Sequence, residues 1–165
     1  MKKNFDYIKF VKRVSIEQIE EGIDFCPKFN DEGLLPCITI ENKSKIVLMF
    51  SFVNEFALKK TIASGRGHYY SRSRNSVWLK GEKSGMFHQV TDIFVDDDQD
   101  CIIYEVVLDK PTKGGKEASC HVGYKSCFYR KLEKKGKNLE LKFTESKKSF
   151  DPEIIYQGEE NPTKI

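Results

Sequence analysis

Long apolar runs are missing from this sequence. No uninterrupted apolar stretch approaches the ~18 residues that a membrane-spanning helix requires. The first residues, from Met1 to Asp6, are mostly charged or polar, and they show neither the apolar run nor the small residues of a signal peptide. We therefore expect no membrane contact and a cytoplasmic location.

A large excess of one charge is missing as well. The chain has 28 lysines and arginines against 25 acidic residues, which gives a formal net charge of +3. Proteins dedicated to nucleic acid usually carry more positive charge, or gather it on one face. The balance argues against nucleic acid as a partner and suits a local site for an anionic small molecule.

Cysteine is scarce, and its number is odd. The five cysteines are Cys26, Cys37, Cys101, Cys120 and Cys127. In a cytoplasmic protein, such a count disfavours a disulfide framework and favours metal ligands or buried thiols. For Cys26 and Cys37 we expect simple packing in the core.

Hydrophobic and aromatic residues, by contrast, are plentiful. Of the 165 residues, 39% are hydrophobic, with 12 Phe and 7 Tyr beside 1 Trp. This content excludes a disordered chain, and the length fits one compact domain with a real core.

Two short helices are indicated by their capping signals. Ser15 begins an S-x-x-Q capping box, and apolar residues follow it at near-helical spacing. Asn54 is a good N-cap for a helix that runs to about Ser64, with Gly65 just beyond its end.

Strands dominate the rest of the chain. The expected strands cover residues 34–40, 45–52, 68–73, 76–80, 89–95 and 101–108, followed by a hairpin of residues 128–133 and 139–144. Residues 110–116 contain Pro111, Gly114 and Gly115 and are expected to form a loop. The tail after Phe143 is expected to be a solvated edge. The fold class predicted is a β-rich α+β domain.

One candidate site is the segment Cys120-His121-Val122-Gly123-Tyr124-Lys125-Ser126-Cys127. The two thiols can reach one metal ion if the chain turns at Gly123. Zinc favours thiolates, and a catalytic zinc keeps a water whose pKa falls toward neutrality. The alternative is a pair of buried cysteines in a strand–turn–strand, because C-x6-C is not a standard zinc-finger interval.

A second candidate is the acidic run Asp96-Asp97-Asp98-Gln99-Asp100. On an extended backbone, Asp96, Asp98 and Asp100 project to one side. Their mutual repulsion is relieved by a hard cation such as Mg²⁺. An EF-hand is excluded, because Cys101 stands where that loop requires glycine. A solvated acidic turn is the alternative.

A third candidate is the run Ser71-Arg72-Ser73-Arg74, with Trp78 and Lys80 after it. On a strand, this alternation places both guanidinium groups on one face and both hydroxyls on the other. Arginine suits phosphate oxygens, and aromatic neighbours can stack on a base. The segment is typical of a nucleotide phosphate site; the alternatives are an ordinary basic strand face and a nucleic-acid patch.

Taken in order, these segments closely resemble the phosphoribosyl-AMP cyclohydrolase family. The resemblance runs from about Phe29 to Arg130. Its motifs are Gly33-Leu34-Leu35-Pro36, Val47-Leu48-Met49, Asn54-Glu55, Tyr70-Ser71-Arg72-Ser73-Arg74, Trp78 with Lys80-Gly81-Glu82, Ser84-Gly85, the acidic run, and Cys120-His121 with Ser126-Cys127-Phe128-Tyr129-Arg130.

The resemblance implies a metal-dependent cyclic amidine hydrolase of histidine biosynthesis, folded as a twisted sheet or barrel with short helices. Its reaction adds water to C6 of an N1-ribosylated adenine nucleotide and breaks the N1–C6 bond. A homodimer with active sites shared between the subunits is implied. Zn²⁺ is expected on Cys120 and Cys127 with a third ligand from the partner, and Mg²⁺ on Asp96, Asp98 and Asp100.

Roles for other residues follow from the same resemblance. His121 is the expected general base or proton shuttle. Arg72 and Arg74, with Ser71, Ser73 and Lys80, are expected to bind the substrate. Three regions are expected within one domain: residues 1–28 as an extension with a short helix, 29–130 as the cyclohydrolase core, and 131–165 as a hairpin and tail. No fused second enzyme is expected, because few residues follow Arg130.

The chain departs from the family's pattern at the third zinc ligand. The family's usual run is Asp-Cys-Asp-x-Asp, and here Asp97 takes the place of that cysteine. Asp97 can bind zinc as a harder ligand. Cys101 is an alternative that needs rearrangement, because it lies about 13 Å further along an extended chain. Loss of the zinc site is the third possibility.

Met86 and His88 also replace residues that are commonly polar in the family. His88 is either a new ligand or proton carrier, or a structural histidine. These changes leave two other functions open: hydrolysis of a related purine nucleotide, and non-catalytic nucleotide binding.

Overall fold

The computed structural model describes residues 5 and 7–163, and in this part of the chain strands predominate. The strands are β1 (Leu34–Glu41), β2 (Val47–Asn54), β3 (His68–Ser71), β4 (Ser76–Leu79), β5 (His88–Val95), β6 (Ile102–Leu108), β7 (Arg130–Lys135) and β8 (Asn138–Phe143). The helices are α1 (Ile16–Glu20), α2 (Glu55–Ser64) and α3 (Pro152–Ile155). The predicted β-rich α+β class is confirmed.

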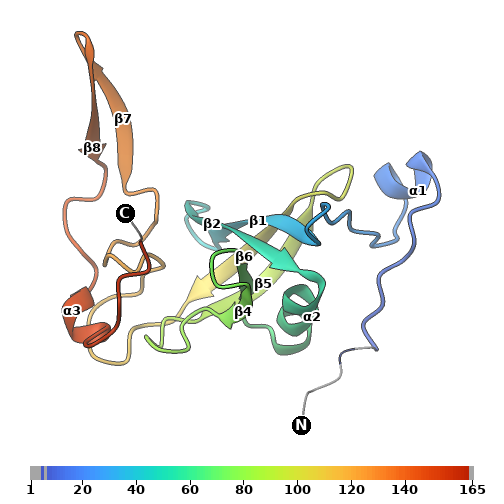
Figure 1. The fold of residues 1–165 in the computed structure, drawn as a ribbon, viewed down its shortest axis with the longest axis horizontal. Helices are drawn as coiled ribbons and strands as arrows, with labels where there is room; N and C mark the ends of the chain where they lie inside the picture. Colours follow the sequence, from blue (N-terminus) through green and yellow to red (C-terminus); the bar gives the residue numbers. More distant parts are fainter. Residues whose placement is uncertain (1–4, 6, 164–165) are drawn as a thin grey trace.

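A six-stranded sheet of order β4-β3-β2-β1-β6-β5 forms the body, and the β7–β8 hairpin projects away from it (Figure 1). The central strand β1 pairs with β2 in antiparallel and with β6 in parallel fashion. Neighbours on both edges satisfy its backbone, and its inward side chains Leu35, Cys37 and Thr39 are completely buried.

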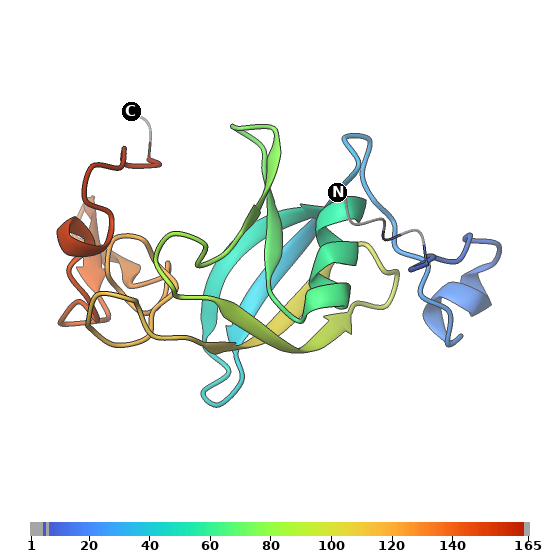
Figure 2. The same cartoon turned by 90° about the horizontal axis from the view of Figure 1, so that it is seen from below.

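Helix α2 begins and ends where the sequence predicts. The Asn54 side chain accepts a hydrogen bond from the backbone N–H of Ala57 at 2.8 Å, and Gly65 ends the helix with a left-handed φ of 68°. Ala57 and Leu58 are buried in the main core, where the helix packs against the sheet (Figure 2).

The sheet curls into a half-barrel, because the segment before β3 also bonds to β5. Gly67 donates its N–H to the carbonyl of His88, and Val90 donates to that of Gly65, both at 2.8 Å. An isolated antiparallel bridge joins Arg66 to Gln89 between them. The curled sheet encloses Tyr69 and other large buried side chains.

Strand β3 ends earlier than expected. Strand β3 stops at Ser71, and residues 72–75 form a turn in which Asn75 has a φ of 49°. The prediction that residues 72 and 73 continue the strand, and with it the alternation of faces along Ser71-Arg72-Ser73-Arg74, is therefore wrong. Strand propensity favoured an extended chain, but the short β3–β4 hairpin needs turn residues here.

The acidic run is likewise a turn and not an extended segment. Strand β5 stops at Val95, and the N–H of Asp96 donates to the carbonyl of Cys101 at 3.2 Å. Gln99 takes a left-handed φ of 58°, and the Asp96 side chain accepts the N–H of Cys101 at 3.0 Å. The prediction of alternating aspartates on one side is thus wrong, because the chain reverses between β5 and β6.

The segment after β8 folds back onto the body, where a solvated tail was expected. Phe150 and Ile155 are buried and form a second, small core with Met86 and Ala118. This packing places the segment beside the loop that contains both Cys120 and Cys127. No helix within residues 5 and 7–163 has the length and apolar character needed to cross a membrane.

Candidate functional site

The structure brings the thiols of Cys120 and Cys127 together. The chain turns at Gly123, whose φ is 105° and whose N–H donates to the Cys120 carbonyl at 3.1 Å. A hydrogen bond from the Cys127 thiol lowers the pKa of Cys120 to about 7, against the opposing effect of burial. The same bond raises the pKa of Cys127, which keeps the proton. Such a pair offers one thiolate and one thiol at a single point.

The loop that carries these thiols is fixed to the start of β2. The N–H of Cys127 donates to the carbonyl of Leu48 at 2.7 Å. The Ser126 hydroxyl donates to the carbonyl of Val47, also at 2.7 Å, and it accepts the N–H of Phe128 at 2.8 Å. Cys127 therefore lies beside the first residues of β2.

Lys80 lies behind the thiol pair. Its side chain is buried, and Nζ donates to the carbonyl of Ser119 at 2.5 Å. Burial lowers the pKa of Lys80, while the nearby sulfurs of Cys127 and Cys120 favour its charged form. This cation is thus placed to stabilise a thiolate. It is not among the residues that line a hollow of the sheet beside Arg72 and Arg74, which is described below.

His88 has a structural position. It is completely buried, with Nδ1 at 2.7 Å from the Tyr69 hydroxyl and Nε2 at 3.1 Å from the Ser119 hydroxyl. Burial, and then the charge of Lys80, hold its pKa well below the usual range. Both ring nitrogens are occupied, so His88 connects the core to the thiol loop and offers no free nitrogen to a metal.

His121 lies next to Cys120 and is half-buried. Its Nε2 is buried and has no hydrogen-bond partner among the described residues. Burial and then the charge of Lys80 lower the pKa of His121, while a hydrogen bond with Asn161 acts in the other direction. A neutral imidazole with an uncommitted nitrogen can accept a proton.

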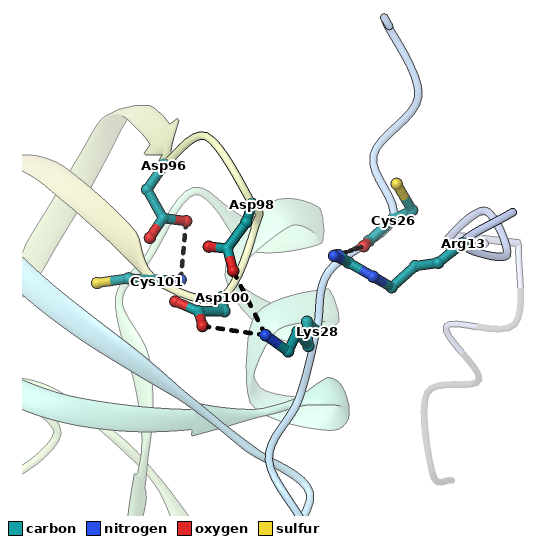
Figure 3. Close-up of polar contacts among 7 residues, drawn as sticks. All are labelled: Arg13, Cys26, Lys28, Asp96, Asp98, Asp100 and Cys101. Carbon is teal, nitrogen blue, oxygen red and sulfur yellow. Dashed lines mark hydrogen bonds and ion pairs between the residues drawn. The ribbon is translucent and has the colours of Figure 1, made fainter. Parts of the chain in front are cut away.

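The acidic turn groups three carboxylates. One oxygen from each of Asp96, Asp97 and Asp98 lies within 4.8 Å of the others. Asp100 instead faces the N-terminal segment, where Lys28 Nζ lies 3.4 Å from Oδ2 of both Asp98 and Asp100 (Figure 3). Carboxylates at this spacing suit a hard cation.

The N-terminal segment is held on this turn by Gln99. Its buried side chain accepts the N–H of Cys26 at 2.8 Å and donates to the carbonyls of Ile19 and Asp24 at 3.0 and 3.1 Å. Sequence reasoning did not identify Gln99 or Lys28, since neither belongs to a motif that predicts these contacts.

Cys101 is much closer to the acidic turn than an extended chain would allow. Because the turn reverses the chain, its N–H lies at 3.0 Å from Asp96 Oδ1 (Figure 3). Burial, with the charges of Asp96 and Asp100, raises the pKa of the Cys101 thiol. The turn thus brings the Cys101 backbone to Asp96, while the thiol lies 3.9 Å from the carbonyl of Ile102 and the local charge opposes a thiolate.

The thiol pair and the acidic turn lie at opposite ends of the chain's fold. The β5–β6 turn lies toward α1, and the loop that precedes β7 lies toward α3 (Figure 1). Within one chain, the two groups do not meet.

The arginines of the third candidate border a separate hollow on the sheet. The Arg72 guanidinium lies over the Phe52 ring at 4.3 Å, and that of Arg74 lies 5.9 Å from the centre of the Trp78 ring. The Ser73 hydroxyl lies 3.4 Å from that of Ser71. The hollow is lined by Met49, Phe50, Ser51, Phe52, Tyr70, Ser71, Arg72, Arg74 and Trp78. Cationic forks above aromatic rings suit a phosphorylated aromatic ligand.

Comparison with known proteins gives one consistent result. Residues 49–129 match the family model of phosphoribosyl-AMP cyclohydrolase. The phosphoribosyl-AMP cyclohydrolase of Bradyrhizobium diazoefficiens is 41% identical over 140 residues, which cover 85% of this chain and 95% of the relative. That of Methanoregula boonei is 45% identical over 129 residues, which cover 78% of this chain and 93% of the relative.

Proposed function

The chain belongs to the phosphoribosyl-AMP cyclohydrolase family, and from this premise we propose which of its residues bind metal, transfer protons and bind substrate. The family activity is that of a metal-dependent cyclic amidine hydrolase in histidine biosynthesis. It opens the adenine ring of 1-(5-phosphoribosyl)-AMP between N1 and C6. A nucleotide substrate is consistent with the hollow lined by Arg72 and Arg74.

Cys120 and Cys127 are proposed to hold Zn²⁺, with Asp97 of a second copy as the third ligand. The donor set fits, because two sulfurs face each other and a buried ammonium favours their ionised form. When bound, zinc supplies Lewis acidity and an activated water. Cys101 is the alternative third ligand, since the turn brings its backbone to Asp96.

Asp96, Asp98 and Asp100 are proposed to hold Mg²⁺. The grouping of Asp96 with Asp98 supports this assignment, as does the preference of Mg²⁺ for carboxylate oxygens. The ion pair of Lys28 with Asp98 and Asp100 occupies two of the same carboxylates, so Mg²⁺ binding requires this ammonium to move aside.

The remaining roles concern protons and the substrate. His121 is proposed as the general base, because its unpartnered Nε2 can take a proton from the attacking water beside the thiol pair. Ser71, Arg72, Ser73 and Arg74 are proposed to bind the phosphates. Lys80 is better placed to stabilise the thiolates than to bind substrate directly.

A homodimer with shared active sites is proposed. One observation carries this proposal: the thiol pair and the acidic turn lie at opposite ends of the same sheet, so only a second copy can bring one to the other. We further propose a cytoplasmic location, where free thiols are maintained, and a function without nucleic acid or membrane.

Mixing two inactive variants tests the shared site. Cys127→Ser and Asp97→Ala each remove a ligand, and phosphoribosyl-AMP turnover, followed by the absorbance of the opened product, should be lost in both. In a heterodimer of the two, one of the two sites is intact. After exchange of subunits at a protein concentration high enough for every pairing to dimerise, activity should therefore recover to about a quarter of the wild-type value, as random pairing of the two variants requires. The control is a mixture of two variants of the same residue, in which no pairing restores an intact site. If the mixture of Cys127→Ser with Asp97→Ala regains no activity, a site built from both copies is excluded.

A further inference from the structure

Glu145 makes an unusual contact with the thiol loop. It belongs to the segment between β8 and α3, beyond residues 49–129 that match the family model. Its carboxylate accepts two successive backbone N–H groups, that of Lys125 at 2.8 Å and that of Ser126 at 2.9 Å. Each N–H reaches a different oxygen of the carboxylate, so one side chain holds two peptide units in a fixed orientation.

These peptide units directly precede Cys127. On their other side, the N–H of Cys127 and the hydroxyl of Ser126 are bonded to the carbonyls of Leu48 and Val47. The backbone before the second thiol is therefore clamped between β2 and the Glu145 carboxylate. Hydrogen bonds to an ionised acceptor are stronger than neutral ones, which favours this side chain for the task.

The same C-terminal segment also closes over the middle of the loop. The N–H of Ser149 donates to the carbonyl of Gly123 at 2.7 Å. A Cβ atom at Gly123 would lie 2.7 Å from the carbonyl oxygen of Phe150, so the two segments are in close contact. The segment that carries Glu145 is thus held against the loop at a second point, so the position of Glu145 limits the movement of the loop.

We propose that Glu145 is a positioning residue for the two thiols: by holding the peptides before Cys127, it keeps both sulfurs directed at one metal ion. This inference rests on the assignment of zinc to Cys120 and Cys127. It concerns the geometry of the ligands and not the charge of Glu145.

Three variants of the full chain separate geometry from charge. Glu145→Gln removes the charge but keeps one acceptor oxygen and the length of the side chain. Glu145→Ala removes both acceptors. Glu140→Gln is the matched control, because Glu140 lies on the exposed hairpin and pairs with Lys135, away from the loop. Zinc affinity is measured by competition with a chromophoric chelator, and the visible spectrum of the Co²⁺-substituted protein reports ligand geometry.

Zinc affinity should fall by about 10- to 100-fold in Glu145→Ala, the range typical of residues that orient metal ligands. Glu145→Gln should lie between this variant and the wild type, and Glu140→Gln should match the wild type. The Co²⁺ bands should change in the same order. Far-UV circular dichroism and thermal unfolding identify the folded variants. If Glu145→Ala does not fold, the loss of zinc affinity in Glu145→Gln relative to Glu140→Gln tests the proposal.

Two results would overturn the proposal. Wild-type affinity and spectrum in the folded Glu145 variants would show that the loop needs no such support. An equal loss in Glu145→Gln and Glu145→Ala would assign the effect to charge. Wild-type protein that takes up no zinc through its thiols is a different failure, because it removes the metal assignment itself.

Discussion

At the scale of single residues, Asp97 distinguishes this chain from its family's pattern. It stands where the resemblance places a cysteine, and its carboxylate lies with those of Asp96 and Asp98. A carboxylate is a harder ligand than a thiolate and binds zinc less strongly in a mixed site. In the proposed zinc site, a carboxylate therefore takes the place of a softer thiolate.

Restoring the thiolate should strengthen zinc binding. We expect Asp97→Cys to raise zinc affinity, because a soft ligand then joins Cys120 and Cys127. Chelator competition provides the measurement, with Asp97→Asn as a control that removes the charge and adds no thiol. A lower affinity in Asp97→Cys would mean that Asp97 does not stand where the family's thiolate stands.

His88, another departure from the family's pattern, has a structural position inside the protein. Its ring joins Tyr69 to Ser119, the residue next to Cys120, and both nitrogens are used in doing so. Met86 is also completely buried, in the small core with Phe150. Both side chains are thus buried beside residues that lead into the thiol loop, where they support it.

At the scale of elements, the N-terminal segment depends on one side chain. Gln99 uses its amide to satisfy the N–H of Cys26 and the carbonyls of Ile19 and Asp24. The left-handed backbone of Gln99 directs this amide toward the segment from within the acidic turn. Attachment of the segment and the shape of the turn are therefore coupled.

Gln99→Ala should release the N-terminal segment. Loss of a partner for a buried polar group costs about 1–3 kcal/mol, and Cys26 is completely buried. We expect lower stability in urea unfolding and faster hydrogen exchange at the Cys26 amide. Gln89→Ala, which removes a single bond to Asp109, is the control. Unchanged exchange at Cys26 would mean that other contacts hold the segment.

The elements that could be predicted were those with local signals. The N-cap at Asn54 and the glycine at Gly65 determined α2, and the apolar pattern of residues 101–108 determined β6. The turn after Ser71 was missed, because residues with strand propensity gave no sign of chain reversal. The turn after Val95 was foreseen only as the alternative to an extended acidic run.

The same limit applies to the candidate site. Cys120 and Cys127 are near in sequence, so their meeting required only a turn at Gly123. Glu145 reaches the loop across 19 and 20 residues, and Gln99 reaches Cys26 across 73. Contacts of this kind depend on the tertiary fold, and no spacing rule in the sequence predicts them.

At the scale of the whole molecule, the proposed zinc ion bridges two copies. Its ligands come from opposite ends of the sheet, so metal binding and association of the copies are linked. Exposed apolar side chains are also available for association, among them Phe50 on β2 and Phe128 after the thiol loop.

Removal of zinc should therefore weaken the dimer. We expect a chelator specific for zinc to shift the protein toward the monomer at low micromolar concentration, as measured by sedimentation velocity, and Zn²⁺ should restore the dimer. The Cys127→Ser variant should show the monomer-rich distribution without chelator. A dimer that is equally stable in all these conditions would mean that the metal does not link the copies.

The Lys28 ammonium beside Asp98 and Asp100 has a consequence for how the acidic turn folds. It serves as an internal counter-ion, so crowded carboxylates can adopt their final arrangement before any inorganic ion arrives. Binding of Mg²⁺ at the proposed site would then exchange one positive charge for another.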